Sequence, residues 1–307
     1  MKPWILWIIR IPLILFGLAA SVVLIAGIAY LILDHTNGTI ISSGEKRSYL
    51  LYVPRSYNPS TPTPLVISIH GFIEWPAHQM QITHWNDLAD QFGFIVVYPS
   101  GTSFPKRWRT QLEPDSGTMP DVTFISDLID KLESEYFLDP RRIYANGLSN
   151  GGGLSVLLSC ELSDRIAAIG TVAGAFSFPW RECPPSRPVP TIVFHGTVDP
   201  IVPYIGGPSH DPAFALPDIP SWVESLAQRN GCIPVPFEIP ASGAVSGLHY
   251  TNCTQNADVI FYTVSGGGHS WPGGEPLPKF IAGPTNQDID STKVMWDFFQ
   301  QHPLPGD

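Results

Sequence analysis

The sequence predicts an α/β fold, in which a mostly parallel sheet is covered by helices on both faces and is preceded by one N-terminal transmembrane helix. Two observations support it: apolar runs of strand length alternate with segments of helical period, and residues 11–33 form an uncharged apolar run. Strands that alternate with helices pair in parallel, because each crossover returns the chain to the same edge of the sheet. Enclosure by helices also explains why the strands read as continuous apolar runs.

The individual elements follow from apolar period and from residues that end helices. Seven strands are predicted, at residues 49–53, 65–69, 94–98, 142–145, 167–172, 191–195 and 259–264. Helices are predicted at residues 80–92, from Asp121 to Leu132, directly after Gly151, and at residues 219–229 and 287–299. Gly93 is a typical C-terminal helix residue, and Asp121 is predicted to cap its helix.

The N-terminal run sets the domain organisation. It is long enough to cross a bilayer, which takes about 20 helical residues. Lys2 and Arg10 precede it and Asp34 follows it, so the positive-inside rule places the rest of the chain outside the cytoplasm, in the periplasm or the extracellular space. We therefore predict an anchor at residues 1–34, a linker at 35–44 and one globular domain at 45–307. The alternative is a signal peptide cut before Tyr30, which would release the domain, but the apolar core exceeds the usual length.

Four cysteines lie in the part of the chain placed outside the cytoplasm: Cys160, Cys183, Cys232 and Cys253. Disulfides persist there, and the absence of a Cys-x-x-Cys pair argues against zinc. Four cysteines allow three connectivities, among which we favour the nearest neighbours, Cys160 with Cys183 and Cys232 with Cys253.

The charge of the chain argues against one class of partner. There are 17 basic and 27 acidic residues, for a formal net charge of −10. No basic patch or arginine-rich helix is present, so we expect no nucleic-acid partner. Acidity of this size mainly supports solubility.

The most informative motif is Gly147-Leu-Ser-Asn-Gly151, which lies between a short strand and an apolar helix. A reactive serine must project from a sharp strand-to-helix turn, and the two glycines relieve the crowding there. Ser149 is therefore the candidate nucleophile.

A base and an acid are expected at the carboxyl ends of other strands, where reactive groups gather in parallel sheets. Asp199 follows the strand at 191–195, and His269 follows the strand at 259–264. The order Ser149, Asp199, His269 is that of the α/β-hydrolase fold. Taken singly, Asp199 is equally well a turn residue before Pro200, and His269 an ordinary loop histidine.

An oxyanion hole is also required, because the tetrahedral intermediate of acyl transfer carries a negative charge. The backbone N–H of Asn150, next to the nucleophile, is one candidate donor. The second is expected after Ile69, from Gly71 or Phe72, although His70-Gly71 is also compatible with a simple tight turn.

Together these motifs resemble the secreted polyhydroxybutyrate depolymerase and feruloyl esterase group of α/β-hydrolases, close to the LpqC-type esterases. The resemblance covers roughly residues 45–299 and rests on His70-Gly-Phe, Trp85-Asn-Asp-Leu-Ala-Asp, Phe94-Ile-Val-Val-Tyr-Pro-Ser-Gly, Gly147-Leu-Ser-Asn-Gly-Gly, His195-Gly-Thr-Val-Asp-Pro-Ile-Val-Pro and Gly266-Gly-Gly-His-Ser-Trp-Pro. It implies a triad of Ser149, Asp199 and His269, and an acyl-serine mechanism without metal or organic cofactor. It also implies that Trp271 lines or supports the site, and we take Trp271 and His70 as candidates for substrate contact.

The resemblance implies hydrolysis of short hydroxyalkanoate, feruloyl or acetyl esters, or of oligoesters, outside the cytoplasm. It weakens between Thr102 and Pro120, where relatives often carry a loop richer in cysteine and glycine and this chain has Lys106-Arg-Trp-Arg-Thr. Trp75, Trp85 and Trp108 could floor a pocket for an aromatic acyl group, although such residues more often serve packing. Two other functions stay open: a serine peptidase of the same fold, and an inactive hydrolase-fold binding protein.

Overall fold

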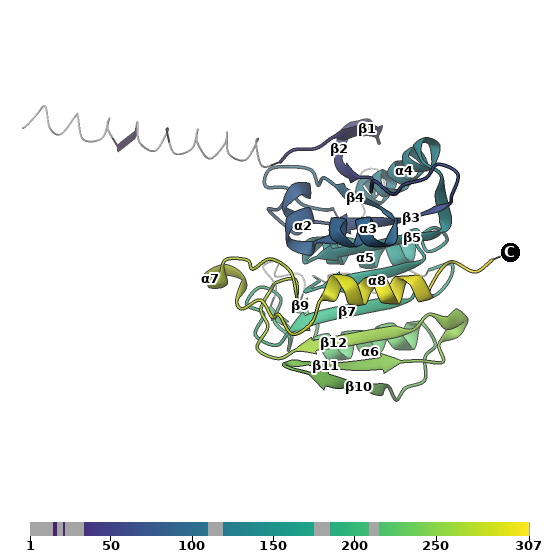
Figure 1. Ribbon diagram of the computed structural model, residues 1–307. Coiled ribbons are helices and arrows are strands. Elements are labelled where there is room, and N and C mark those ends of the chain that lie inside the picture. The colour runs from purple at the N-terminus through teal and green to yellow at the C-terminus, as the bar shows by residue number, and fades with distance from the viewer. Residues whose placement is uncertain are drawn as a thin grey trace, which may run out of the picture. The chain divides into compact units, whose positions relative to one another are not determined.

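The computed structural model describes residues 34–109, 119–174, 185–208 and 215–306, together with residues 15, 16 and 21. The chain divides into two compact units, Met1–His35 and Thr36–Asp307, and the second holds all the elements discussed below (Figure 1). The predicted anchor lies almost entirely outside the described residues. Among the residues that are described, we find no helix long and apolar enough to span a membrane.

A ten-stranded sheet forms the centre of the second unit, in the order β1-β2-β4-β3-β5-β6-β7-β12-β11-β10. Its six central strands, from β4 to β12, pair in parallel, and the outer strands pair antiparallel on both sides. The strands are β1 (Gly38–Ser42), β2 (Glu45–Tyr52), β3 (Thr63–Ile69), β4 (Ile95–Pro99), β5 (Leu138–Leu148), β6 (Ala168–Val172), β7 (Thr191–Gly196), β10 (Phe237–Ser242), β11 (Val245–Tyr250) and β12 (Val259–Val264). A separate two-stranded ladder joins β8 (Gly207–Pro208) to β9 (Ala215–Leu216).

Helices cover both faces of the sheet, as predicted (Figure 1). In the part of the chain that the structure describes, they are α2 (Pro76–Thr83), α3 (Trp85–Phe92), α4 (Pro120–Glu135), α5 (Asn150–Glu161), α6 (Ile219–Arg229), α7 (Lys279–Ala282) and α8 (Ser291–Gln301), and the 3₁₀ turn η2 spans Thr254–Asn256. Apolar residues of α4, α5 and α6 pack in one core cluster, and those of α2, α3 and α8 pack in a second.

The alternation of side chains along the strands explains the two clusters. In β3, Leu65 and Ile67 belong to the cluster with α4 to α6, whereas Val66 belongs to the other. All three side chains are fully buried. A strand buried on both faces needs apolar residues at every position, which is the pattern that predicted it.

The structure corrects three local expectations. Residues 38–42 of the predicted linker form the edge strand β1. The helix predicted at 80–92 is two helices, because His84 adopts a left-handed backbone conformation with φ 56°. Asp121 does not cap α4, whose N-cap is Met119. Its carboxylate is instead buried against Arg47, with 2.7 Å between Oδ1 and Nη1.

Candidate active site

Ser149 stands at the turn between β5 and α5 with φ 55° and ψ −119°, a conformation that a non-glycine residue rarely adopts. The turn is so tight that glycine is required on both sides. A Cβ added to Gly147 would lie 2.4 Å from the carbonyl carbon of Gly151, and one added to Gly151 would lie 2.2 Å from the carbonyl oxygen of Ile69. The local geometry is that of a nucleophile elbow, and strain of this kind is concentrated at functional sites.

Backbone hydrogen bonds continue past the ends of the central strands and hold the segments that follow side by side. The N–H of Ser149 donates to the carbonyl of Val172 at 2.9 Å, and that of Ala173 donates to the carbonyl of Phe194 at 3.0 Å. The N–H groups of Thr197 and Val198 donate to the carbonyls of Val264 and Gly267, both at 3.0 Å. Ser149, Asp199 and His269 therefore follow the carboxyl ends of β5, β7 and β12, three strands of the same parallel array.

Asp199 and His269 are in direct contact. Nδ1 of His269 donates to Oδ2 of Asp199 at 2.8 Å, and both residues are 5% exposed. The other carboxylate oxygen, Oδ1, accepts the N–H groups of Ile201 and Val202, each at 2.8 Å. The carboxylate is thus held in one orientation, and the imidazole proton is fixed on Nδ1, which leaves Nε2 as the proton acceptor.

A second histidine, His195, lies beside the same carboxylate and was not predicted as part of the site. Its Nε2 donates to the carbonyl of Val202 at 2.8 Å and lies 3.5 Å from Oδ2 of Asp199. Burial lowers the pKa of His195, so the ring is neutral and adds no positive charge beside Asp199. The motif His195-Gly-Thr-Val-Asp199 contained both residues, but spacing alone does not show that the strand end turns the ring toward the carboxylate.

Hydrogen bonds in the loop after β3 distinguish between Gly71 and Phe72, the two candidates for the second oxyanion donor. The N–H of Gly71 donates to Oε2 of Glu74 at 2.8 Å, so it is already satisfied. The N–H groups of Ile73 and Glu74 donate to the carbonyls of Lys106 and Gly71, at 2.9 and 3.3 Å. Within the described residues the N–H of Phe72 has no acceptor, and neither has that of Asn150 at the start of α5.

Glu74 is an acidic residue of this loop that sequence reasoning missed. Burial raises the pKa of its carboxyl, against the opposing effects of His78, of the Gly71 N–H and of His269. Because Glu74 occupies the Gly71 N–H, Phe72 and Asn150 stay as the candidate oxyanion donors and Gly71 is set aside.

Both candidates for substrate contact need correction, because His70 and Trp271 are buried, at 0% and 1% exposure. Nε2 of His70 accepts the N–H of Gly101 at 2.9 Å, which places the ring proton on Nδ1, and Nδ1 donates to the carbonyl of Gly71 at 2.7 Å. Nε1 of Trp271 donates to Oγ1 of Thr292 at 2.8 Å. Both rings support the loops that carry the site and do not face a substrate.

The predicted pairing of Cys232 with Cys253 is confirmed, with an S–S distance of 2.01 Å. Cys160 is also disulfide-bonded. Its predicted partner, Cys183, lies outside the described residues.

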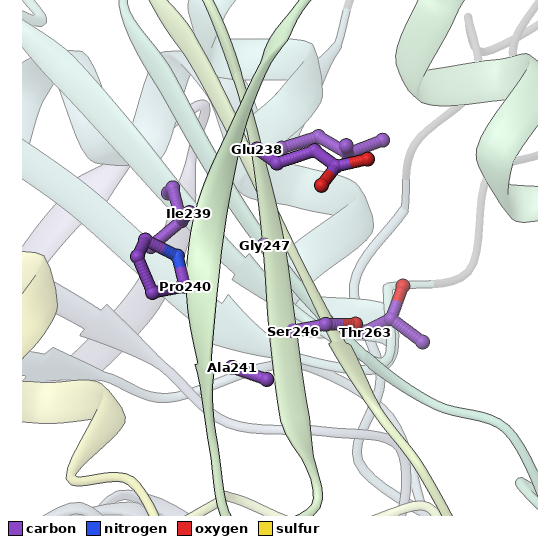
Figure 2. Close-up of a pocket in the computed structure, with 8 residues that line it drawn as sticks. Glu238, Ile239, Pro240, Ala241, Ser246, Gly247 and Thr263 are labelled. Carbon is purple, nitrogen blue, oxygen red and sulfur yellow. The ribbon is translucent and has the colours of Figure 1, made fainter.

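A pocket of about 480 Å³ lies away from the triad, on the antiparallel side of the sheet (Figure 2). It is lined by residues of β10 and β11 and by Thr263 of β12. None of the predicted site residues is among those that line it, and Glu238 is its one ionisable side chain. Nothing in its lining provides a nucleophile beside a base.

The sheet order and the elbow define an α/β-hydrolase-like fold, and comparison with known proteins agrees. The structure matches that of an acetyl xylan esterase from Aspergillus awamori with a TM-score of 0.60, at 15% identity, over 86% of this chain and 98% of the other. A likeness at this level of identity supports the fold alone. Residues 47–179 match the family model described as esterase PHB depolymerase, so this part of the chain carries an esterase PHB depolymerase domain.

Curated relatives carry esterase names. One is a bifunctional acetylxylan esterase/xylanase from Neocallimastix patriciarum, 35% identical over 161 residues, which cover 52% of this chain and 22% of the relative. Another is feruloyl esterase B from Piromyces equi, 28% identical over 268 residues, which cover 84% of this chain and 46% of the relative. The chain thus spans less than half of either protein. A further relative is named poly(3-hydroxybutyrate) depolymerase. The resemblance that the motifs predicted is confirmed by this family match and by these esterase-named relatives.

Proposed function

We propose that this protein is a serine carboxylic-ester hydrolase that works through an acyl-enzyme, with Ser149 as nucleophile, His269 as general base and Asp199 as the acid that orients it. The observation that carries the proposal is the 2.8 Å hydrogen bond between His269 and Asp199, on the same edge of the sheet as the strained elbow at Ser149. The esterase names of the relatives support the same reaction class.

The reaction follows from the roles of these groups. Nε2 of His269 takes the proton of the Ser149 hydroxyl as Oγ attacks the carbonyl carbon of the ester. The negative charge that develops on the carbonyl oxygen is stabilised by the N–H groups of Phe72 and Asn150. The imidazolium then gives its proton to the alcohol oxygen as the C–O bond breaks. A water molecule, deprotonated by His269, releases the acid from the acyl-enzyme by the same route.

For substrate we propose short hydroxyalkanoate, feruloyl or acetyl esters and their oligomers. The side chains of Phe72, Ile73 and Val198 are exposed and adjoin the oxyanion loop and Asp199, which favours acyl groups without charge. The bonded cysteines and the apolar run at residues 11–33 support a location outside the cytoplasm, with the N-terminal segment as membrane anchor.

The proposal is tested by hydrolysis of p-nitrophenyl acetate and butyrate by the full-length chain and by its Ser149→Ala variant, with a serine-directed phosphonate as a covalent probe. We expect turnover and phosphonate labelling of Ser149 in the wild type, and the loss of both in the variant. A peptide panel assayed beside the esters separates an esterase from a peptidase. A folded wild-type protein that is silent in all three assays would instead be a binding protein on the hydrolase fold.

A further inference from the structure

Residues 101–109, which follow β4, contact both sides of the loop that carries the Phe72 N–H. The carbonyl of Lys106 accepts the N–H of Ile73 at 2.9 Å, and Nε1 of Trp108 donates to the carbonyl of His70 at 2.8 Å. The 101–109 segment therefore holds the residues that bracket Gly71 and Phe72.

The same segment contacts the residue that follows the nucleophile. Oδ1 of Asn150 accepts the backbone N–H of Trp108 at 2.7 Å, and Nδ2 of Asn150 donates to the carbonyl of Trp108 at 3.3 Å. The Asn150 side chain thus pairs with the backbone of Trp108 through two hydrogen bonds. Trp108 is the residue that touches both the β3 loop and the start of α5, and each of these carries one oxyanion donor.

The loop that Trp108 supports cannot hold its shape unaided. Ile73 has φ 67°, a left-handed conformation that is sterically unfavourable for a β-branched residue. Such a conformation persists where neighbours fix it, and here the Lys106 carbonyl does so. Trp108 itself is rigidly placed, because it is 3% exposed and its ring lies 5.0 Å from that of His70.

The far end of the segment is fixed as well. The N–H of Arg109 donates to Oδ2 of Asp121 at 2.6 Å, and Asp121 forms the buried ion pair with Arg47. The segment is therefore fixed in the core at Arg109, directly after Trp108, which contacts both halves of the proposed oxyanion hole.

We propose that Trp108 is a positioning residue, which sets the distance between the oxyanion donors of Phe72 and Asn150 through its indole N–H and its backbone. This inference rests on the proposed esterase function. An oxyanion is stabilised only when both donors reach hydrogen-bond distance in the transition state, so a small displacement of one of them lowers turnover. Substrate binding depends on other contacts and is little affected.

The test uses full-length Trp108→Phe, which keeps an aromatic ring but loses the indole N–H, and Asn150→Ala, which keeps the backbone donor but loses the side-chain amide. The matched control is Trp85→Phe, because Trp85 is equally buried and its Nε1 donates to Oδ1 of Asn146 at 3.1 Å. For each variant, kcat and KM for p-nitrophenyl butyrate, the rate of phosphonate labelling and the denaturation midpoint are measured.

We expect kcat and the labelling rate to fall about 10- to 100-fold in Trp108→Phe and in Asn150→Ala, with KM changed by less than about threefold. In the Trp108→Phe/Asn150→Ala double variant, kcat should fall by less than the product of the two single fold-losses, because both changes break the same link between the β3 loop and α5. Trp85→Phe should keep kcat within about threefold, whatever it does to the denaturation midpoint.

The inference is wrong if Trp108→Phe keeps wild-type kcat, if the loss lies in KM, or if Trp85→Phe loses as much. Should Trp108→Phe fail to fold, Asn150→Ala decides alone, and an unchanged kcat in that variant overturns the proposal. A wild-type protein without esterase activity or labelling contradicts the proposed function, whereas an active wild type with unaffected variants contradicts this inference alone.

Discussion

The carboxylate of Asp199 binds His269 with one oxygen and the backbone with the other. Oδ2 accepts Nδ1–H of His269 at 2.8 Å, and Oδ1 accepts two backbone N–H groups, each at 2.8 Å. The two oxygens are therefore not interchangeable. If one were replaced by an amide NH₂, the backbone donors would keep the remaining oxygen, and the NH₂ would face the imidazole.

The Asp199→Asn variant should consequently fold but turn over slowly. The amide would donate to Nδ1 of His269 and force the imidazole proton onto Nε2, which then cannot accept the proton of Ser149. We expect kcat to fall by about 10³- to 10⁴-fold on a p-nitrophenyl ester, with KM nearly unchanged.

A matched control for that variant is Asp258→Asn. Oδ2 of Asp258 lies 2.8 Å from Nε2 of His249, so the same chemical change is made in a second carboxylate–histidine pair, one that follows no elbow. Activity in this control should stay within about twofold of wild type. An Asp199→Asn protein that retained more than a tenth of wild-type kcat would contradict the role of Asp199.

The elbow predicts a large effect for one added methyl group. In Gly151→Ala the Cβ would lie 2.2 Å from the carbonyl oxygen of Ile69, which belongs to the backbone of β3 and cannot rotate away. We expect the free energy of unfolding to fall by about 2–4 kcal/mol and the esterase activity to be lost. Denaturant unfolding and p-nitrophenyl butyrate turnover measure the two effects.

Gly306→Ala provides the comparison, because a Cβ there would lie 3.6 Å from the guanidinium of Arg141, an ordinary contact. Its stability should stay within about 0.5 kcal/mol of wild type. Equal stability of the two alanine variants would mean that the turn is less crowded than the structure indicates.

The centre of the fold was predictable from the sequence because its strands are buried on both faces. β7 and β12 were predicted within one residue at each end, and α6 was predicted with its observed ends. Among the outer strands, β2 was predicted in part, at 49–53, whereas β1, β10 and β11 were not found, because their residues face solvent on at least one side. β10 has no fully buried residue and contains Pro240, a residue that sheets tolerate at their edges.

Some features of the candidate site were likewise predictable from the sequence, and others were not. The contact between Asp199 and His269 was predictable, because each of the two residues follows a recognisable strand and the chain order is informative. The choice between Gly71 and Phe72 was not, since it depends on a carboxylate three residues later that takes the Gly71 N–H. Adjacency in a motif likewise suggested substrate contact for His70 and Trp271, but it does not reveal which way a side chain points.

His70 predicts a dependence of stability on pH. Burial lowers its pKa to about 3 in the folded protein, from an ordinary value of 6.5. The folded state therefore disfavours the charged ring, and the unfolded chain binds more protons between pH 6.5 and pH 3. The contribution of neutral His70 is complete above pH 6.5 and is lost as the pH falls toward 3, by on the order of 3 kcal/mol at pH 4.

The measurement compares wild type with His70→Asn by denaturant unfolding at pH 7, 6, 5 and 4. The stability advantage of the wild type should shrink steadily as the pH falls, because the variant has no ring to protonate. A constant difference between wild type and His70→Asn at all four pH values would contradict the assignment.

The buried ion pair of Arg47 and Asp121 predicts that substitution of Asp121 lowers stability, with an effect on kcat only through the 101–109 segment. Arg47 is 2% exposed, and its Nη1 lies 2.7 Å from Oδ1 of Asp121, so Asp121→Asn leaves a buried guanidinium without its counter-charge. We expect the free energy of unfolding to fall by about 3–5 kcal/mol. The asparagine oxygen can still accept the Arg109 N–H, so the 101–109 segment should stay in place and the folded variant should keep its kcat.

Asp121→Ala removes that acceptor as well, so it should lower both the free energy of unfolding and kcat. Glu135→Gln, which breaks the exposed pair with Lys131, is the control and should change neither appreciably. If Asp121→Asn proved as stable as that control, the ion pair would not stabilise the fold. If Asp121→Ala kept full kcat, the oxyanion loop would not depend on the anchored end of the segment.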